Sequence, residues 1–92
     1  MTEVSHAPDR HRYEVSVDGQ MVGRLDYRRD ADGVVLLTHA EVTPRIGGRG
    51  IGTELVRSAL DDLADKGERI VPVCSFVRAF VRENPDYQRL VA

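Results

Sequence analysis

The sequence predicts an α+β (α/β) domain with the element order β-β-β-α-β-α, in which an antiparallel meander gains one parallel return strand and the helices pack on the sheet. Two different spacings of apolar residues predict this order of elements. Apolar residues alternate with polar ones over residues 12–42, and they recur at helical spacing from residue 55 onward. A glycine-dense segment at residues 45–52 separates the two regions. With 92 residues, of which 41% are hydrophobic and 30% charged, the chain has the composition of one compact domain.

The domain boundary follows from where the alternation begins. Residues 1–11 contain charged side chains, a proline and few apolar residues, so we expect a loosely ordered lead-in there. Residues 12–92 are expected to form the single domain.

Three strands are expected in the first half of the chain. Residues 12–17 alternate between polar and apolar, and the Asp18-Gly19 pair that follows is typical of a hairpin turn. A second alternating run covers residues 21–28 and ends in turn residues at 30–33. Residues 34–42 are nearly continuously apolar and rich in branched side chains, which is typical of a central strand.

Helices and one further strand are expected in the second half. Apolar residues at 55–64 form one helical stripe, and Lys66-Gly67 is expected to close that helix. Residues 69–73 predict a short strand, which must return parallel to the third strand through a right-handed crossover. Ser75 is expected to cap a second helix, which ends at Asn84-Pro85 because the residue before a proline avoids helical angles.

Composition and charge exclude several classes of protein. The apolar runs are far shorter than the roughly 20 residues of a membrane span, and the N-terminus lacks the pattern of a signal peptide. A formal net charge of -2 does not favour binding to nucleic acid. The single cysteine excludes an internal disulfide and a cysteine-based zinc site. We therefore expect a cytoplasmic monomer or weak homodimer that binds no metal, nucleic acid or membrane.

The arrangement of strand, glycine-rich loop and helix is one that binds phosphate groups, because backbone N–H groups and the helix dipole converge there. A nucleotide P-loop would need a lysine that residues 48–53 do not supply. A dinucleotide fingerprint would need the spacing G-x-G-x-x-G, whereas Gly48, Gly50 and Gly52 give G-x-G-x-G. Both of these phosphate ligands are therefore disfavoured.

The residues Arg45-x-x-Gly48-x-Gly50, which follow Glu41-Val42-x-Pro44, match a more specific pattern. This segment resembles the coenzyme A pyrophosphate loop of the GNAT-type N-acetyltransferases, whose signature is [QR]-x-x-G-x-[GA] between a long strand and a helix. Two later motifs, Pro72-x-Cys74-Ser75-Phe76-Val77 and Asn84-Pro85-x-Tyr87-x-x-Leu90-Val91, are similar to the minimal GNAT domains called YjdJ-type. The resemblance spans nearly the whole chain and implies a GNAT-like fold.

The resemblance also implies a site for acetyl-coenzyme A, as cosubstrate, in a cleft between the third and fourth predicted strands. Pro72 agrees with such a cleft, because a proline removes one ladder donor where the neighbouring strand has moved away. The residues expected to bind acetyl-coenzyme A are Glu41, Val42, Thr43, Arg45, Gly47, Gly48, Arg49, Gly50, Ile51, Gly52, Thr53, Cys74 and Phe76.

Three residues are candidates for catalysis. Cys74 lies at the start of a predicted helix, where it either accepts the acetyl group by thioester exchange or only lines the cleft during direct attack by an amine. His39 and Glu41 are expected on one face of the third strand, with Thr38, Ala40 and Val42 on the other. Either His39 or Glu41 could take the proton of the incoming amine, or both could belong to a solvated sheet face.

The predicted function is acetyl-coenzyme A dependent N-acetyltransfer to a primary amine, which could be a protein lysine, a protein N-terminus or a small amine. The alternative is a non-catalytic module that binds or senses coenzyme A or an acyl-coenzyme A. A third possibility is a structural module that uses neither the loop nor Cys74. The sequence does not name the acceptor.

Overall fold

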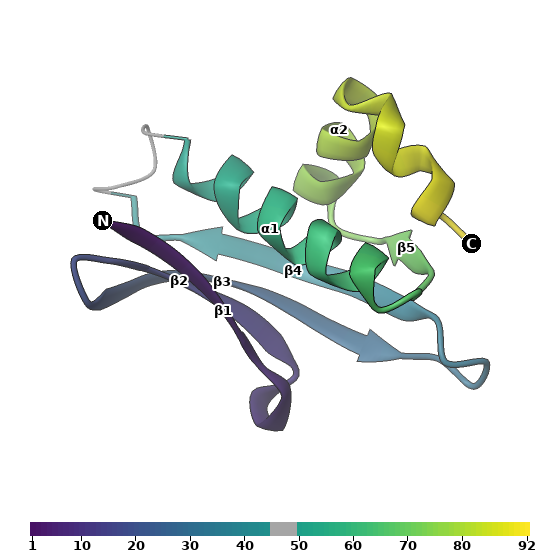
Figure 1. Ribbon diagram of the computed structural model, residues 1–92, viewed down its shortest axis with the longest axis horizontal. Helices are drawn as coiled ribbons and strands as arrows, with labels where there is room; N and C mark the ends of the chain where they lie inside the picture. The colour runs from purple at the N-terminus through teal and green to yellow at the C-terminus, as the bar shows by residue number, and fades with distance from the viewer. Residues whose placement is uncertain (45–49) are drawn as a thin grey trace.

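The computed structural model describes residues 1–44 and 50–92. Five strands form one sheet in the order β1-β2-β3-β4-β5, and both α-helices lie on the same face of it (Figure 1). The predicted fold class is confirmed, with one antiparallel strand more than the sequence indicated. The elements are β1 (Thr2–Ala7), η1 (Pro8–Arg10), β2 (Arg12–Val17), β3 (Gln20–Arg29), β4 (Val35–Val42), α1 (Ile51–Asp65), β5 (Ile70–Pro72), α2 (Ser75–Glu83) and η3 (Pro85–Leu90).

The expectation of a loose lead-in at residues 1–11 is wrong, because Thr2–Ala7 form the edge strand β1. This strand pairs with β2 along its whole length, from Thr2↔Val17 to Ala7↔Arg12. The His6 ring stacks on Tyr13 with the ring centroids 4.4 Å apart. The hydrophobic pattern of residues 2–7 is weak because Val4 is the only large aliphatic side chain of the strand. The strand is therefore held by its pairing with β2 and by the contacts of His6.

The third predicted strand is β4, and its register with β3 contains an irregularity that matters for the site. Asp26 pairs with His39, but the next residue of β3, Tyr27, pairs with Leu37, so Thr38 is an extra residue in β4. Before Thr38, Leu37 faces the helices and is fully buried. After it the alternation is reversed, and His39 is 54% exposed on the opposite face.

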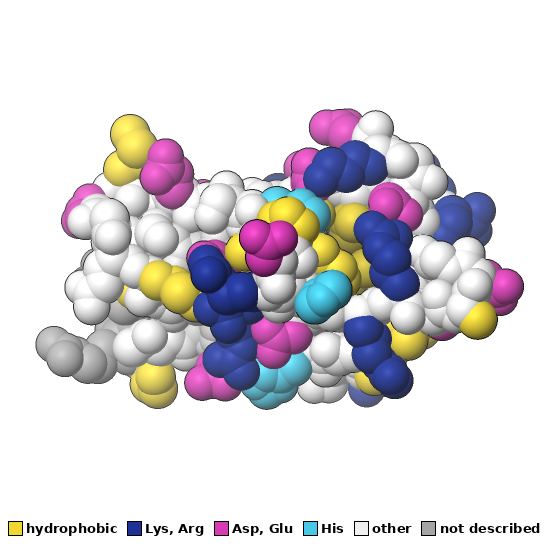
Figure 2. Space-filling view, turned by 90° about the horizontal axis from the view of Figure 1, so that it is seen from below, with side chains coloured by type: hydrophobic (Ala, Val, Ile, Leu, Met, Phe, Trp, Pro, Cys, Tyr) yellow, Lys and Arg dark blue, Asp and Glu magenta, His cyan; other side chains and the backbone are white. Residues whose placement is uncertain are grey.

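That opposite face is covered by no helix in the part of the chain that the structure describes, and we call it the open face. Figure 2 views this side and shows basic, acidic and histidine side chains intermixed. Its strand residues include Arg12, Glu14, Arg24, Asp26, His39 and Glu41, several of which form ion pairs with one another.

The helices follow the predicted stripes, with one correction at a helix start. In α1 the side chains of Leu55, Val56 and Leu63 are buried, as the periodicity indicated. Ser75 does not cap α2, because Cys74 already occupies the N-cap position: its carbonyl oxygen accepts the N–H of Arg78 at 2.9 Å. The side chain of Cys74 makes no capping hydrogen bond.

A cluster of polar and aromatic side chains ties β1 to α1. Tyr13 Oη donates to Asp62 Oδ2 at 2.6 Å, and Lys66 Nζ donates to the same oxygen at 2.8 Å. His6 Nε2 lies 2.7 Å from Tyr27 Oη, and its Nδ1 lies 3.4 Å from Lys66 Nζ. Burial, assisted by the charge of Lys66, lowers the pKa of His6 below its ordinary value.

The lowered pKa of His6 predicts that stability falls on mild acidification. The unfolded chain takes up this proton near pH 6.5, whereas the folded chain takes it up only at lower pH. Because the unfolded state binds more protons in that window, the free energy of unfolding decreases as pH falls below about 6.5. We expect His6→Gln to flatten this decrease, measured by urea unfolding between about pH 7.5 and about pH 5.5. If the free energy of unfolding of His6→Gln depended on pH as steeply as that of the unaltered chain, His6 would not be the cause of the decrease.

Close packing at Gly23 predicts a second stability effect. A Cβ there would lie 2.8 Å from the carbonyl oxygen of Glu41 and 3.0 Å from Val15 Cγ1. Gly23→Ala should therefore lower the free energy of unfolding by about 1–3 kcal/mol, measured by urea unfolding. Gly52→Ala is the comparison, because its nearest neighbour is the tip of the half-exposed Phe76 ring and alanine favours the helix by about 1 kcal/mol. A loss at Gly52 as large as that at Gly23 would contradict the packing argument.

Candidate functional site

The candidate site begins where β4 and β5 separate. The two strands pair over three residues, ending at Leu37↔Pro72. The N–H of Cys74 then donates to the carbonyl oxygen of Leu37 at 2.9 Å, and the chain turns into α2. Within residues 1–44 and 50–92, the edge of β4 beyond Leu37 has no strand beside it on the β5 side.

This edge of β4 presents unpaired backbone groups to the opening. The N–H of Thr43 donates to Val22 on the β3 side at 2.7 Å. Since the backbone groups of successive strand residues point to opposite neighbours, those of Ala40 and Val42 point away from β3. The described residues supply no hydrogen-bond partner for them. An extended ligand with amide groups could therefore pair with Ala40 and Val42 as a strand would.

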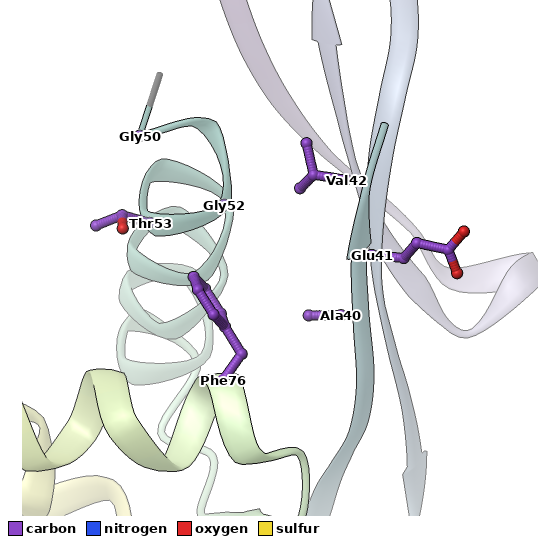
Figure 3. A pocket seen from close by; sticks show the side chains of 7 residues that line it. All are labelled: Ala40, Glu41, Val42, Gly50, Gly52, Thr53 and Phe76. Carbon is purple, nitrogen blue, oxygen red and sulfur yellow. The ribbon is translucent and has the colours of Figure 1, made fainter. Parts of the chain in front are cut away.

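A cavity of about 400 Å³ lies between this edge and the two helices. Figure 3 shows Ala40 and Val42 pointing toward α1 across the cavity, with Glu41 pointing away. A Cβ at Gly52 would lie 3.1 Å from Phe76 Cζ, so the glycine leaves room between α1 and this aromatic ring. The residues that line the cavity are Ala40, Glu41, Val42, Gly50, Gly52, Thr53 and Phe76.

The first turn of α1 closes one end of the cavity. Gly50 occupies the N-cap position with a φ of 72°, a left-handed conformation that favours glycine. Among the residues that the structure describes, no side chain caps the N–H groups of this first turn. Free N–H groups and the positive end of a 15-residue helix dipole suit an anionic group such as a phosphate.

The structure brings most of the predicted cofactor residues it describes to this cavity. Ile51 is instead 6% exposed and packs into the core, and the Thr43 N–H is used by β3. Cys74 is half-buried at the point where β4 and β5 separate. Arg45, Gly47, Gly48 and Arg49 lie outside the described residues. Ala40 is a lining residue that was not predicted, although its two-residue spacing from Val42 places both on one face.

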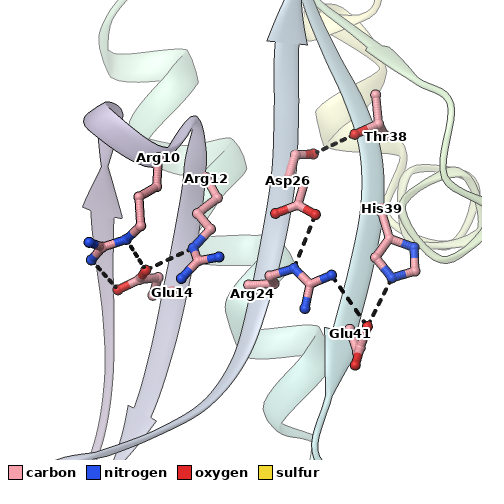
Figure 4. Close-up of polar contacts among 8 residues, drawn as sticks. All are labelled: Arg10, Arg12, Glu14, Arg24, Asp26, Thr38, His39 and Glu41. Atoms are coloured by element: carbon pink, nitrogen blue, oxygen red, sulfur yellow. Dashed lines mark hydrogen bonds and ion pairs between the residues drawn. The ribbon is translucent and has the colours of Figure 1, made fainter.

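His39 and Glu41 form a separate cluster on the open face. Glu41 Oε1 lies 3.1 Å from His39 Nε2 and 3.4 Å from Arg24 Nη2, and Arg24 Nε donates to Asp26 Oδ2 at 3.1 Å (Figure 4). The hydrogen bond from His39 and the charge of Arg24 lower the pKa of Glu41. Arg24 and Asp26 were not among the predicted site residues, because only the register of β3 with β4 brings them beside this pair.

Two features that would point to other functions are not found in the part of the chain that the structure describes. Neither helix there is long and apolar enough to cross a membrane. No three His, Cys, Asp or Glu side chains among residues 1–44 and 50–92 are placed to hold a metal ion.

Comparison with known proteins gives a consistent result. The family model described as "GCN5-related N-acetyl-transferase" matches residues 12–90. Among curated proteins, the chain is 32% identical over 83 residues to Protein NATD1 of Bos taurus, which covers 89% of this chain and 74% of the relative. Protein NATD1 of Homo sapiens is 30% identical over 83 residues, with the same shares covered.

Two solved structures share the fold. An NMR structure of a GCN5-like protein from Staphylococcus aureus superimposes with a TM-score of 0.74 at 18% identity, covering 98% of this chain and 87% of the other. The crystal structure of ribosomal-protein-alanine N-acetyltransferase from Brucella melitensis biovar Abortus 2308 gives a TM-score of 0.53 at 19% identity. It covers 88% of this chain and 62% of the other chain. At these identities the likeness shows the fold alone.

Proposed function

The chain belongs to the GCN5-related N-acetyl-transferase family, and from this premise we propose that it transfers the acetyl group of acetyl-coenzyme A to a primary amine. The observation that carries the proposal is the cavity between the unpaired edge of β4 and the first turn of α1. The narrower resemblance to YjdJ-type domains stays a prediction, as do the cytoplasmic location and the monomeric or weakly dimeric state.

Each part of acetyl-coenzyme A finds matching chemistry at this cavity. The N–H groups at the start of α1 suit the pyrophosphate, and Gly50 and Gly52 allow it to approach the backbone closely. The amide groups of the pantetheine arm can pair with the backbone of Ala40 and Val42. Phe76, which is 43% exposed beside the cavity, offers apolar cover for the same arm.

The acetyl end of the donor would then reach the place where β4 and β5 separate. Beyond Thr38, the Ala40 N–H is the first amide of β4 without a hydrogen-bond partner among the described residues, and it can donate to the thioester oxygen as negative charge develops there. We assign Cys74 to the lining of this end, because its side chain packs against the core beside the site. The amine then attacks the thioester directly.

Calorimetric titration with acetyl-coenzyme A tests the site. We expect saturable binding by the unaltered chain and at least about tenfold weaker binding by Gly52→Val, because the added side chain enters the space between α1 and Phe76. Asp65→Val is the matched control, because it places a valine in the same helix at its exposed last residue, away from the cavity. Equal binding by both variants would remove the cavity as the site.

The same samples decide between transfer and binding alone. Acetylation of at least one amine from a panel of peptides, polyamines and small amines supports the proposed function. Tight binding of acetyl-coenzyme A with no product from any of these amines would instead indicate a module that binds or senses the cofactor.

The role of Cys74 is tested by intact-mass measurement and by substitution. With acetyl-coenzyme A and no acceptor, we expect no added acetyl mass on the protein, and we expect Cys74→Ala to retain transfer within about threefold. An acetyl adduct that disappears in Cys74→Ala, together with loss of transfer, would establish the route through an acetylated cysteine instead.

A further inference from the structure

The cluster on the open face includes His39 and Glu41, which lie in β4 just beyond the residues that pair with β5. His39 follows directly after Thr38, the residue at which β4 changes its alternation and leaves β5. Its ring is 54% exposed, so a substrate approaching the open face can reach it. The cavity for the donor lies on the helix side of β4, and His39 lies on the other side of the same strand.

The bond to Glu41 determines which nitrogen of the His39 ring is free. An ionised carboxylate accepts hydrogen bonds and donates none, so the proton of a neutral ring belongs on Nε2, 3.1 Å from Glu41 Oε1. The lone pair is then on Nδ1. Figure 4 shows the second ring nitrogen turned away from Glu41 and from β3, which is the side of β4 toward β5.

Arg24 keeps this arrangement in place. Its Nη2 lies 3.4 Å from the Glu41 oxygen that His39 also contacts, while its Nε donates to Asp26. Asp26 is also the cross-strand partner of His39. The side chain of Glu41 is thus held from two directions, by the guanidinium of β3 and by the ring of its own strand.

We infer that His39 Nδ1 takes the proton of the incoming amine, that Glu41 and Arg24 are positioning residues for this ring, and that the acceptor enters from the open face. The inference rests on the proposed acetyl transfer and assigns roles that the sequence left open between His39 and Glu41. It makes His39 a catalytic residue in the sense that the ring contacts the acceptor nitrogen.

The proton balance of the reaction fits this arrangement. A primary amine arrives as an ammonium ion and gives one proton to Nδ1, which frees the nitrogen lone pair. That lone pair forms the bond to the acetyl carbon, and the bond from this carbon to sulfur breaks with its electrons on sulfur. The second proton of the attacking nitrogen goes to the sulfur, which leaves as a thiol, and His39 returns its proton to solvent.

The charges around His39 suit a single ammonium group. From β3 the ring faces Arg24 and Asp26, from β4 it faces Glu41, and residues 70–72 of β5 contain no ionisable side chain. Arg24, Asp26 and Glu41 together leave one net negative charge beside a neutral His39. A primary ammonium neutralises it, so we expect the acceptor to present one cationic amine to this face.

Kinetics and NMR together test the inference. His39→Gln should lower kcat/KM for the acceptor about 100-fold near neutral pH. The difference in kcat/KM between His39→Gln and the unaltered chain should become smaller toward pH 10, because an alkylamine there loses its proton without the help of a base. Nitrogen chemical shifts should show neutral His39 with its proton on Nε2, and this preference should weaken in Glu41→Gln and Arg24→Gln. Glu14→Gln is the matched control, since Glu14 is a carboxylate on the same face bonded to Arg12 at 2.8 Å.

The possible outcomes distinguish the role assigned to His39 from the proposed acetyl transfer itself. Undiminished transfer by His39→Gln, an equal loss at every pH, or a proton found mainly on Nδ1 would overturn the role of His39 and leave the acetyl transfer standing. Binding of acetyl-coenzyme A without transfer by the unaltered chain would overturn the proposed function, and this role of His39 with it.

Discussion

The extra residue in β4 is the constraint on which the candidate site depends. Thr38 has no paired residue in the register with β3, so the strand reverses its alternation between Leu37 and His39. Without this reversal, His39 and Glu41 would continue the face of Leu37 toward the helices, where burying charged groups is costly. With it, Ala40 and Val42 line an apolar cavity while the polar pair faces solvent. One inserted residue thus gives β4 a different chemistry on each side.

Val42 shows how closely the surroundings of the cavity are packed. A Cβ at Gly23 of β3 would lie 3.0 Å from Val42 Cγ2, and a Cβ at Gly52 of α1 would lie 3.7 Å from the same atom. The valine therefore sits between two glycines, one in the neighbouring strand and one in the helix across the cavity. A Cβ at Gly23 would press on the strand edge that we propose binds the donor, whereas a Cβ at Gly52 would lie at an ordinary contact distance from Val42. Packing of β3 against β4 therefore affects the fold and the proposed site together.

Elements whose own residues show a clear hydrophobic periodicity or motif could be predicted from the sequence. Features that depend on how strands pair with one another could not. The stripe of α1 and the loop signature before it are continuous patterns, which locate the helix and the start of the cavity. β1 has little apolar periodicity and is decided by its pairing with β2. The extra residue Thr38 and the approach of Arg24 to Glu41 exist only in the register between β3 and β4. Register depends on contacts between residues far apart in sequence, which no local pattern contains.

The proposed transfer places donor and acceptor on the two faces of one sheet. The helix side of β4 offers an apolar cavity and the positive end of α1, which suit a long anionic cosubstrate. The open face offers carboxylates and an imidazole, which suit a cationic amine. In the part of the chain that the structure describes, β5 ends at Pro72, so no strand lies beside β4 beyond Leu37 on that side. If donor and acceptor bind on opposite faces as proposed, the residues that bind the acceptor can change without altering the donor site.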